Sequence, residues 1–377
     1  MSLTLTLASR NLFHDRLRFI ATLVGIVFSV VLVMVQMGLF LGFGRMVTTM
    51  IDHAATDLWI VPKGAKCFED PSLLDFKLRN RIATVDGVAS VLPLVIGFSD
   101  WRLESGGMTP IFIVGADQRD GALQPWNVVD GNVQGLAQGF SVAVDRTYFD
   151  RLGVSGIGSK AEIRGRKVRV VALTDGIRSF TTTPYVFVDL KNARMFTGTP
   201  RDRANDFLVR LNANADRVKV TEAIRGQIDD AEVLTTAEFR DRSRSFWLFG
   251  TGAGAALFAG ALLGVIVGTV IVAQTLYSST KDHLNEFATL RAMGSSNRYI
   301  YNVIIYQALI NAVIGFAIAY GIGALVVKMT ARSALPIVIT PWLVAALAML
   351  TVVMCVTSAI GAIVRIVRID PASIFMR

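Results

Sequence analysis

One segment of the chain comes near a phosphate-binding pattern, the run GVSGIGSK at 153–160. A phosphate-binding loop ends in Gly-Lys followed by Ser or Thr, and it opens a helix. Here Ser159 precedes Lys160, and the following AEIRGRKVRVVAL alternates like two strands around a turn. We therefore interpret 153–160 as a surface loop, and we expect this chain to hydrolyse no ATP.

Other catalytic or metal-binding patterns are equally weak. His53 is the single histidine between residues 45 and 245, and it stands beside Asp52. A lone histidine of this kind is more typical of an exposed hinge than of a metal site. Asp52, Asp57 and Trp59 could instead shape a lateral entry for a ligand. No paired acids or nucleophile stand out, so we predict a protein without catalytic residues, metal or cofactor of its own.

The charges point to a membrane protein. Uncharged runs at 19–44, 246–280, 299–327 and 333–364 each exceed the roughly 20 apolar residues that cross a bilayer. The fourth span is expected to begin at Pro341, because proline suits the first turn of a helix. The predicted class is an α-helical membrane protein with four transmembrane helices, one before and three after a large extracytoplasmic mixed α+β domain.

Flanking charges set the orientation. Lys and Arg residues lie before the first span, between the second and third, and after the fourth, and these segments stay in the cytoplasm. The predicted order is a cytoplasmic segment 1–18, a span 19–44, an extracytoplasmic domain 45–245, a span with a stalk 246–280, a cytoplasmic loop 281–298, spans 299–327 and 341–364, and a cytoplasmic tail 365–377.

The net charge of +9 has a topological origin. The block 45–245 holds 27 Lys and Arg against 25 Asp and Glu, so most of the excess lies beside the spans. Such charges orient the helices in the membrane, and we do not expect nucleic-acid binding.

The extracytoplasmic block alternates strand-like and helix-like stretches. A β-α-β-β unit near its start and a β-α-β piece near its end could form one split ferredoxin-like part, about 45–125 and 204–240. The stretch about 130–203 is mostly β and would form a second part. We interpret the whole as a binding and force-transmitting module.

The second uncharged run is longer than a span needs. Its residues could include an outward stalk that continues through 238–245, or a tilted helix with an irregular approach. Gly260, Gly264 and Gly268 repeat every four residues, which places them on one face that allows close helix approach. We expect this face to be a homodimer interface, and packing against another span of the same chain is the alternative.

The cytoplasmic loop carries the sharpest motif. Ser279 and Asp282 fit a capping box, Leu284, Phe287 and Leu290 recur at helical spacing, and Gly294 suits a helix stop. This predicts a short amphipathic helix that either rests on lipid headgroups or docks a soluble partner.

The run HLNEFATLRAMG at 283–294 resembles the E-x-x-x-L-[KR]-A-[ML]-G loop of MacB/FtsX-type ABC transporter permeases. The terminal segments and spans are most similar to the DevC permeases of DevBCA-like glycolipid exporters. The resemblance implies that the loop docks a separate ABC ATPase. The residues carried over are Asp282, His283, Glu286, Phe287, Leu290, Arg291, Met293 and Gly294.

The resemblance also implies the assembly. ATP and Mg would bind on the partner ATPase, and the permease would form a homodimer in the inner membrane of a bacterium. A periplasmic adaptor of the membrane fusion type, an outer-membrane duct and a lipid-like or secreted substrate are expected. Alternatives are an FtsX-like signalling subunit that activates a cell-wall hydrolase, and a lipoprotein-release permease.

Overall fold

The computed structural model describes residues 12, 16–104, 106–118, 121, 123–282, 297–330 and 337–367. The chain forms two compact units. One unit contains four long apolar helices, and the other is formed mainly by Phe43–Ala253. This is the one-plus-three arrangement around an α+β domain that the sequence predicts, and the predicted fold class is confirmed.

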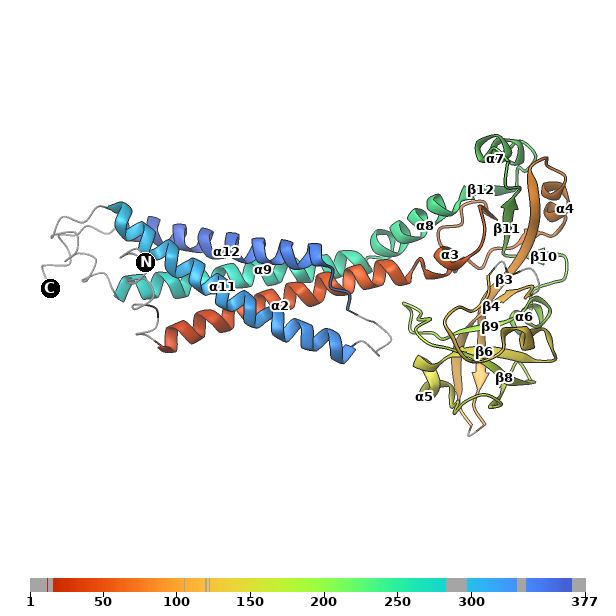
Figure 1. Ribbon diagram of the computed structural model, residues 1–377, viewed down its shortest axis with the longest axis horizontal. Helices are drawn as coiled ribbons and strands as arrows, with labels where there is room; N and C mark the ends of the chain where they lie inside the picture. Colours follow the sequence, from red (N-terminus) through yellow and green to blue (C-terminus); the bar gives the residue numbers. More distant parts are fainter. Residues whose placement is uncertain are drawn as a thin grey trace, which may run out of the picture. The chain divides into compact units, whose positions relative to one another are not determined.

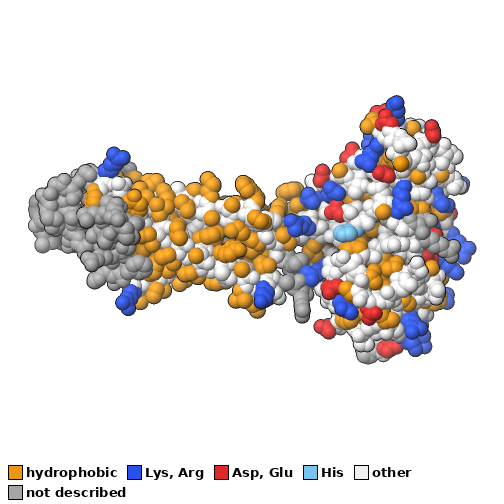
Figure 2. Space-filling model, viewed as in Figure 1, with side chains coloured by type: hydrophobic (Ala, Val, Ile, Leu, Met, Phe, Trp, Pro, Cys, Tyr) orange, Lys and Arg blue, Asp and Glu red, His pale blue; other side chains and the backbone are white. Residues whose placement is uncertain are grey.

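Four long helices of the first unit lie within the described residues (Figure 1). They are α2 (Arg16–Met46), α9 (Ala253–Asp282), α11 (Asn297–Thr330) and α12 (Pro341–Val367). Each is long and apolar enough to cross a membrane. Large apolar side chains such as Val24, Leu262, Val313 and Met349 are more than half exposed. Figure 2 shows hydrophobic side chains gathered over this unit, as expected of a surface that faces lipid.

The helices approach one another closely at glycines. A Cβ atom at Gly264 would lie 3.1 Å from a methyl of Val33, and one at Gly268 would clash with Oγ of Ser29. The Ser29 hydroxyl also donates a 2.7 Å hydrogen bond to the carbonyl oxygen of Gly264. The face formed by Gly260, Gly264 and Gly268 therefore packs against α2 of the same chain, which is the intramolecular alternative.

The uncharged run at 246–280 contains more than one helical element. The run 246–280 divides into a π-helical turn, η3 (Phe246–Gly250), and α9, which begins at Ala253. Gly252 between them has φ +76°, a left-handed conformation that ends a helix at little cost only for glycine. The outward helix α8 (Thr236–Ser245) precedes η3, so a helical stalk is present but is interrupted before the span.

The second unit is built on one ten-stranded sheet in the order β12-β1-β11-β3-β4-β9-β6-β8-β5, with β7 pairing β3 and β8. The strands are β1 (Leu58–Pro62), β3 (Val88–Arg102), β4 (Met108–Ala116), β5 (Val128–Gly131), β6 (Ser141–Asp145), β7 (Lys160–Ile163), β8 (Arg166–Thr174), β9 (Tyr185–Asp189), β11 (Asp206–Leu211) and β12 (Ala231–Thr235). A separate pair joins β2 (Leu74–Asp75) to β10 (Arg203–Ala204).

Neighbouring strands in the order β12, β1, β11 and β3 are antiparallel, and their chain order is that of a split ferredoxin-like unit. Helices α4 (Lys77–Ala83) and α7 (Arg217–Arg225) cover one face of these strands. Leu78, Ile82, Val220 and Ile224 of these helices share a buried cluster with Phe207 of β11. The burial of these side chains fixes the two helices on that face.

Strand β3 runs through both parts of the domain. This strand pairs β11 through its first half and β4 through its second half, so the sheet continues into the β-rich part. That part also contains η1 (Val133–Ala137), η2 (Arg146–Tyr148), α5 (Phe149–Leu152) and α6 (Leu190–Thr197). Because side chains alternate along a strand, Leu94 and Ile96 enter one core and Val95 enters another.

Candidate functional site

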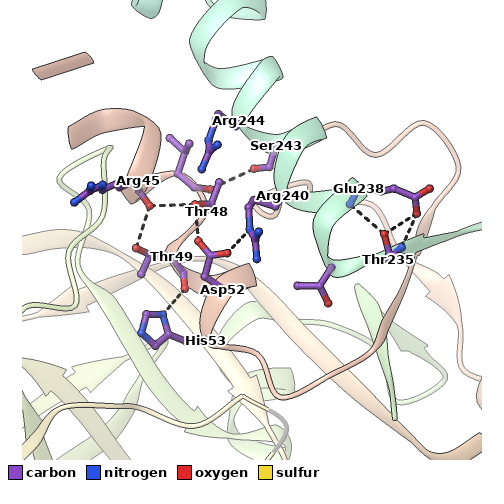
Figure 3. Close-up of polar contacts among 12 residues, drawn as sticks. Arg45, Thr48, Thr49, Asp52, His53, Thr235, Glu238, Arg240, Ser243 and Arg244 are labelled. Atoms are coloured by element: carbon purple, nitrogen blue, oxygen red, sulfur yellow. Dashed lines mark hydrogen bonds and ion pairs between the residues drawn. The ribbon is translucent and has the colours of Figure 1, made fainter. Parts of the chain in front are cut away.

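The segments that lead to the first two spans meet on the domain. One is the end of α2 with the short helix α3 (Thr49–His53), and the other is α8 with η3 (Figure 3). Both pack on the sheet face opposite α4 and α7. Ile51 of α3 and Phe239 of α8 share a buried cluster with Trp59 of β1. The ring centroids of Trp59 and Phe239 are 5.1 Å apart. We call these segments the junction.

Side chains of α8 satisfy the carbonyl groups left open where α2 ends. Arg244 Nε donates to the carbonyl oxygen of Gly44, and Ser243 Oγ donates to that of Val47, each at 3.3 Å. The last carbonyls of a helix have no partner within the helix, and a cation near them is favourable. Figure 3 draws the Ser243 bond as a dashed line from α8 to the segment that directly follows α2.

An ion pair makes a second connection. Arg240 of α8 pairs with Oδ1 of Asp52, whose Oδ2 accepts a 2.8 Å hydrogen bond from Thr48 Oγ1. The two charged side chains are about one third exposed, 38% for Arg240 and 34% for Asp52. Such a pair contributes about 1 kcal/mol or less to stability. The ion pair mainly fixes the positions of the two segments, because Thr48 holds in place the carboxylate that Arg240 contacts.

The start of α8 is anchored by a capping box. Thr235 Oγ1 accepts from the Glu238 backbone, and Glu238 accepts from the Thr235 backbone at 2.7 Å. These bonds lower the pKa of Glu238, mainly through the Thr235 N–H. Helix α8 therefore begins at a defined residue directly after β12.

Arg242 holds the middle of α8 to the domain. Its guanidinium lies 2.8 Å from Glu232 of β12 and donates to the carbonyl oxygen of Ala65. The hydrogen bond from Arg242 is the largest cause of a lowered pKa for Glu232, which also accepts from the Gly64 N–H at 2.7 Å. The loop after β1 is thus bonded to α8.

The candidate entry residues do not gather at one site. Trp59 is fully buried in the core, and Asp57 accepts from the Leu211 backbone and pairs with Arg217 at 2.9 Å. His53 stacks on Trp126 with ring centroids 3.9 Å apart, and its Nδ1 lies 2.9 Å from the Thr49 carbonyl oxygen. Within the part of the chain that the structure describes, no three His, Cys, Asp or Glu side chains form a possible metal site.

The predicted docking motif falls mostly outside the described residues. Asp282 is the last residue of α9. His283, Glu286, Phe287, Leu290, Arg291, Met293 and Gly294 lie within 283–296, which the structure does not describe. The junction is not predicted from the sequence, although the spacing Thr235-x-x-Glu238 is a capping signal for the start of α8. The Asp52 and Arg240 pair left no local signal, because 188 positions separate the two residues.

The arrangement defines a class of protein: a membrane protein with four spans and a large extracytoplasmic α+β domain inserted after the first. A family model described as MacB-like periplasmic core domain matches residues 19–227, and one described as FtsX-like permease C-terminal matches residues 256–371. The chain belongs to this MacB/FtsX-type family of ABC transporter permeases. Membership implies an ABC ATPase as partner.

Two solved structures of extracytoplasmic domains are similar to part of this chain. The periplasmic region of MacB from Actinobacillus actinomycetemcomitans is similar at 10% identity and a TM-score of 0.39, covering 52% of this chain and 96% of that one. The extracellular domain of the noncanonic ABC-type transporter YknZ from Gram-positive bacteria is similar at 15% identity and a TM-score of 0.35, covering 48% and 99%. No curated protein matches the chain.

Proposed function

We propose that this chain is the membrane subunit of a split ABC exporter in a bacterial inner membrane. A separate ATPase would bind ATP and Mg²⁺, and this chain would carry no cofactor. Two copies would form the permease. The single observation that carries the proposal is the junction, where the segments leading to the first two spans are bonded to each other on one face of the domain.

The proposed cycle starts at the cytoplasmic loop. ATP binding would draw the two ATPases together and push on the segments that contain Glu286 and Arg291. Helices α2 and α9 would pass this motion to the extracytoplasmic domain. The domain would then act on a lipid-like or secreted substrate, together with a periplasmic adaptor and an outer-membrane duct.

The contact between two copies of the chain requires a face of the helix bundle that is not covered by another helix of the same chain. Since α2 occupies the face of Gly260, Gly264 and Gly268, the second copy would contact another face of the bundle. Phe258, Leu262 and Ile266 of α9 repeat every four residues and are each at least half exposed. This apolar row is our proposed contact, with membrane lipid as the alternative neighbour.

The test is affinity purification of the tagged chain from its own membranes, followed by mass spectrometry of proteins and lipids. An ATPase recovered with a periplasmic adaptor is the expected result, and enriched lipid would identify the substrate class. An ATPase with a cell-wall hydrolase would favour signalling. Two different permease chains in one complex would favour lipoprotein release. Recovery without any ATPase would contradict the proposal.

A loop variant makes this test specific. Glu286→Arg reverses the charge at the motif residue that we expect to fix the ATPase in register, so the ATPase should be lost from the purified complex. Ser296→Ala, a neighbouring change outside the motif, should retain it. Equal ATPase recovery with both variants would contradict the docking assignment.

A further inference from the structure

A carboxyl group outside the contacts described above lies between the domain and η3. Glu69 belongs to the loop that follows β1, and the residue as a whole is partly exposed. Its carboxyl group is enclosed, because Oε1 accepts from Tyr185 OH and Oε2 accepts from Trp247 Nε1, both at 3.1 Å. Tyr185 lies on β9 and Trp247 on η3. One side chain therefore joins three elements.

Trp247 relays this contact to the first span's helix. Its ring packs on Phe180 with centroids 4.3 Å apart, and Phe180 meets the ring of Phe43 in α2 at 5.4 Å. Met46 and Val47 complete this apolar cluster. The position of the Trp247 indole thus affects both connecting segments of the junction.

The neighbours of Glu69 suit an ionised carboxylate. An indole N–H can only donate, and a tyrosine hydroxyl can donate or accept. The Cys67 thiol is a third donor, and burial together with the nearby Glu69 charge raises its pKa to about 12, so it keeps its proton. A hydrogen bond to a charged acceptor is roughly twice as strong as one between neutral groups. The bond from Trp247 is therefore strongest when Glu69 carries no proton.

Other charged groups stand near the same loop. Lys66 Nζ lies 5.8 Å from the Phe246 ring, Asp70 follows Glu69, and Arg242 of α8 bonds the Ala65 carbonyl oxygen. On β9, burial and the Glu69 charge raise the pKa of Tyr185 well above its usual range, so its hydroxyl remains protonated. Burial is also the main cause that raises the pKa of Glu69, to about 7.

We propose that Glu69 is a positioning residue that holds Trp247 of η3 against the domain through a charge-assisted hydrogen bond, and that protonation of its carboxyl group weakens this link. The inference deepens the proposed function, since it makes the junction respond to the pH outside the membrane. Its contacts lie within one chain, so it is testable without the ATPase, and its failure would leave the exporter proposal standing.

The test follows the indole N–H resonances of the full-length chain in nanodiscs between pH 5 and 8.5. Trp247→Phe removes one resonance and so identifies it. This step is needed because the chain contains five tryptophans, each with an indole N–H of its own. The Trp247 resonance should move with a midpoint near pH 7, downfield as pH rises, because the bond strengthens. A resonance that does not move over this range would overturn the proposal.

Two variants separate positioning from general structure. In Glu69→Gln the acceptor stays neutral, so the Trp247 resonance should lose its titration and stay near its low-pH position. Glu232→Gln changes another carboxylate that contacts the same loop, and there the titration should persist. The same titration in Glu69→Gln as in the wild type would assign it to another group and contradict the proposal. The wild-type titration remains decisive if a variant fails to fold.

Discussion

Asp52 of α3 and Arg240 of α8 form an ion pair across 188 positions of sequence. The pair lies between the segments that lead to the first and second spans. It therefore links the two ends of the insertion that forms the domain. Thr48, four residues before Asp52, also donates a hydrogen bond to the carboxylate. The pair therefore fixes where α8 meets the end of α2 better than two free surface charges would.

The first prediction concerns this pair. Asp52→Asn should lower the free energy of unfolding by about 1 kcal/mol or less, because the pair is partly exposed. It should nevertheless increase hydrogen exchange at 47–53 and 240–245, where the helix ends lose a shared contact. Arg217→Gln breaks a similar pair with Asp57, at 2.9 Å, away from the junction, and should leave that exchange unchanged. Equal exchange in both variants would show that the ion pair does not hold the junction.

The second prediction concerns the start of α8. Thr235→Ala removes a capping side chain and should destabilise the domain by about 1 kcal/mol. Glu238→Gln should cost less, since glutamine at this position can still reach the backbone N–H of Thr235. Thermal unfolding of the full chain measures both effects. A larger loss from Glu238→Gln than from Thr235→Ala would mean that the carboxylate charge, rather than the cap, anchors the helix.

The third prediction separates the two uses of the glycine face. A side chain at Gly264 would meet Val33 and Leu32 of α2, so Gly264→Leu should destabilise the bundle by about 1–3 kcal/mol, the usual effect of overpacking. Gly321→Leu, where an added Cβ would have no neighbour within 4 Å, should be tolerated. Light scattering of both variants measures the oligomeric state, and thermal unfolding measures the stability. A stable Gly264→Leu monomer from a dimeric wild type would place the second copy on this face instead.

The fourth prediction is a dependence of stability on pH. The pKa of Glu69 rises from an unfolded value of 4.5 to about 7, so the folded chain binds more protons between these values. The free energy of unfolding should therefore fall as pH rises from 4.5 to 7, relative to Glu69→Gln. The fall should reach up to about 3 kcal/mol, at 1.36 kcal/mol for each pKa unit. A stability difference that does not vary with pH would contradict it.

The four apolar helices and the α+β insertion could be predicted because both depend on local composition. Uncharged runs identify spans whatever lies around them, and α12 begins at Pro341 for a local reason, the fixed φ of proline. The strand order brings together β1, β11 and β12, as a ferredoxin-like pairing of the first and last pieces would require.

The other features of the fold and of the junction depend on contacts between residues that are far apart in the sequence. Nothing local shows that β3 serves both halves of the sheet, since its residues 91–96 form one continuous buried run with no break between the halves. The interruption at Gly252 lies within an uncharged run, where hydropathy carries no sign of it. The hydrogen-bond partners of Glu69 could not be predicted from the sequence either, because Trp247 and Tyr185 are 178 and 116 positions away.

The most direct test of the account is hydrogen exchange of the complex purified from its own membranes, with ADP and with ATP plus vanadate. We predict that nucleotide state changes protection at the junction, in 43–53 and 236–250, although in the proposed complex the nucleotide binds on the ATPase chain. Gly321→Leu complexes should respond as the wild type does. Identical exchange at the junction in both nucleotide states, in a complex that hydrolyses ATP, would contradict the claim that this chain couples the ATPase to its extracytoplasmic domain.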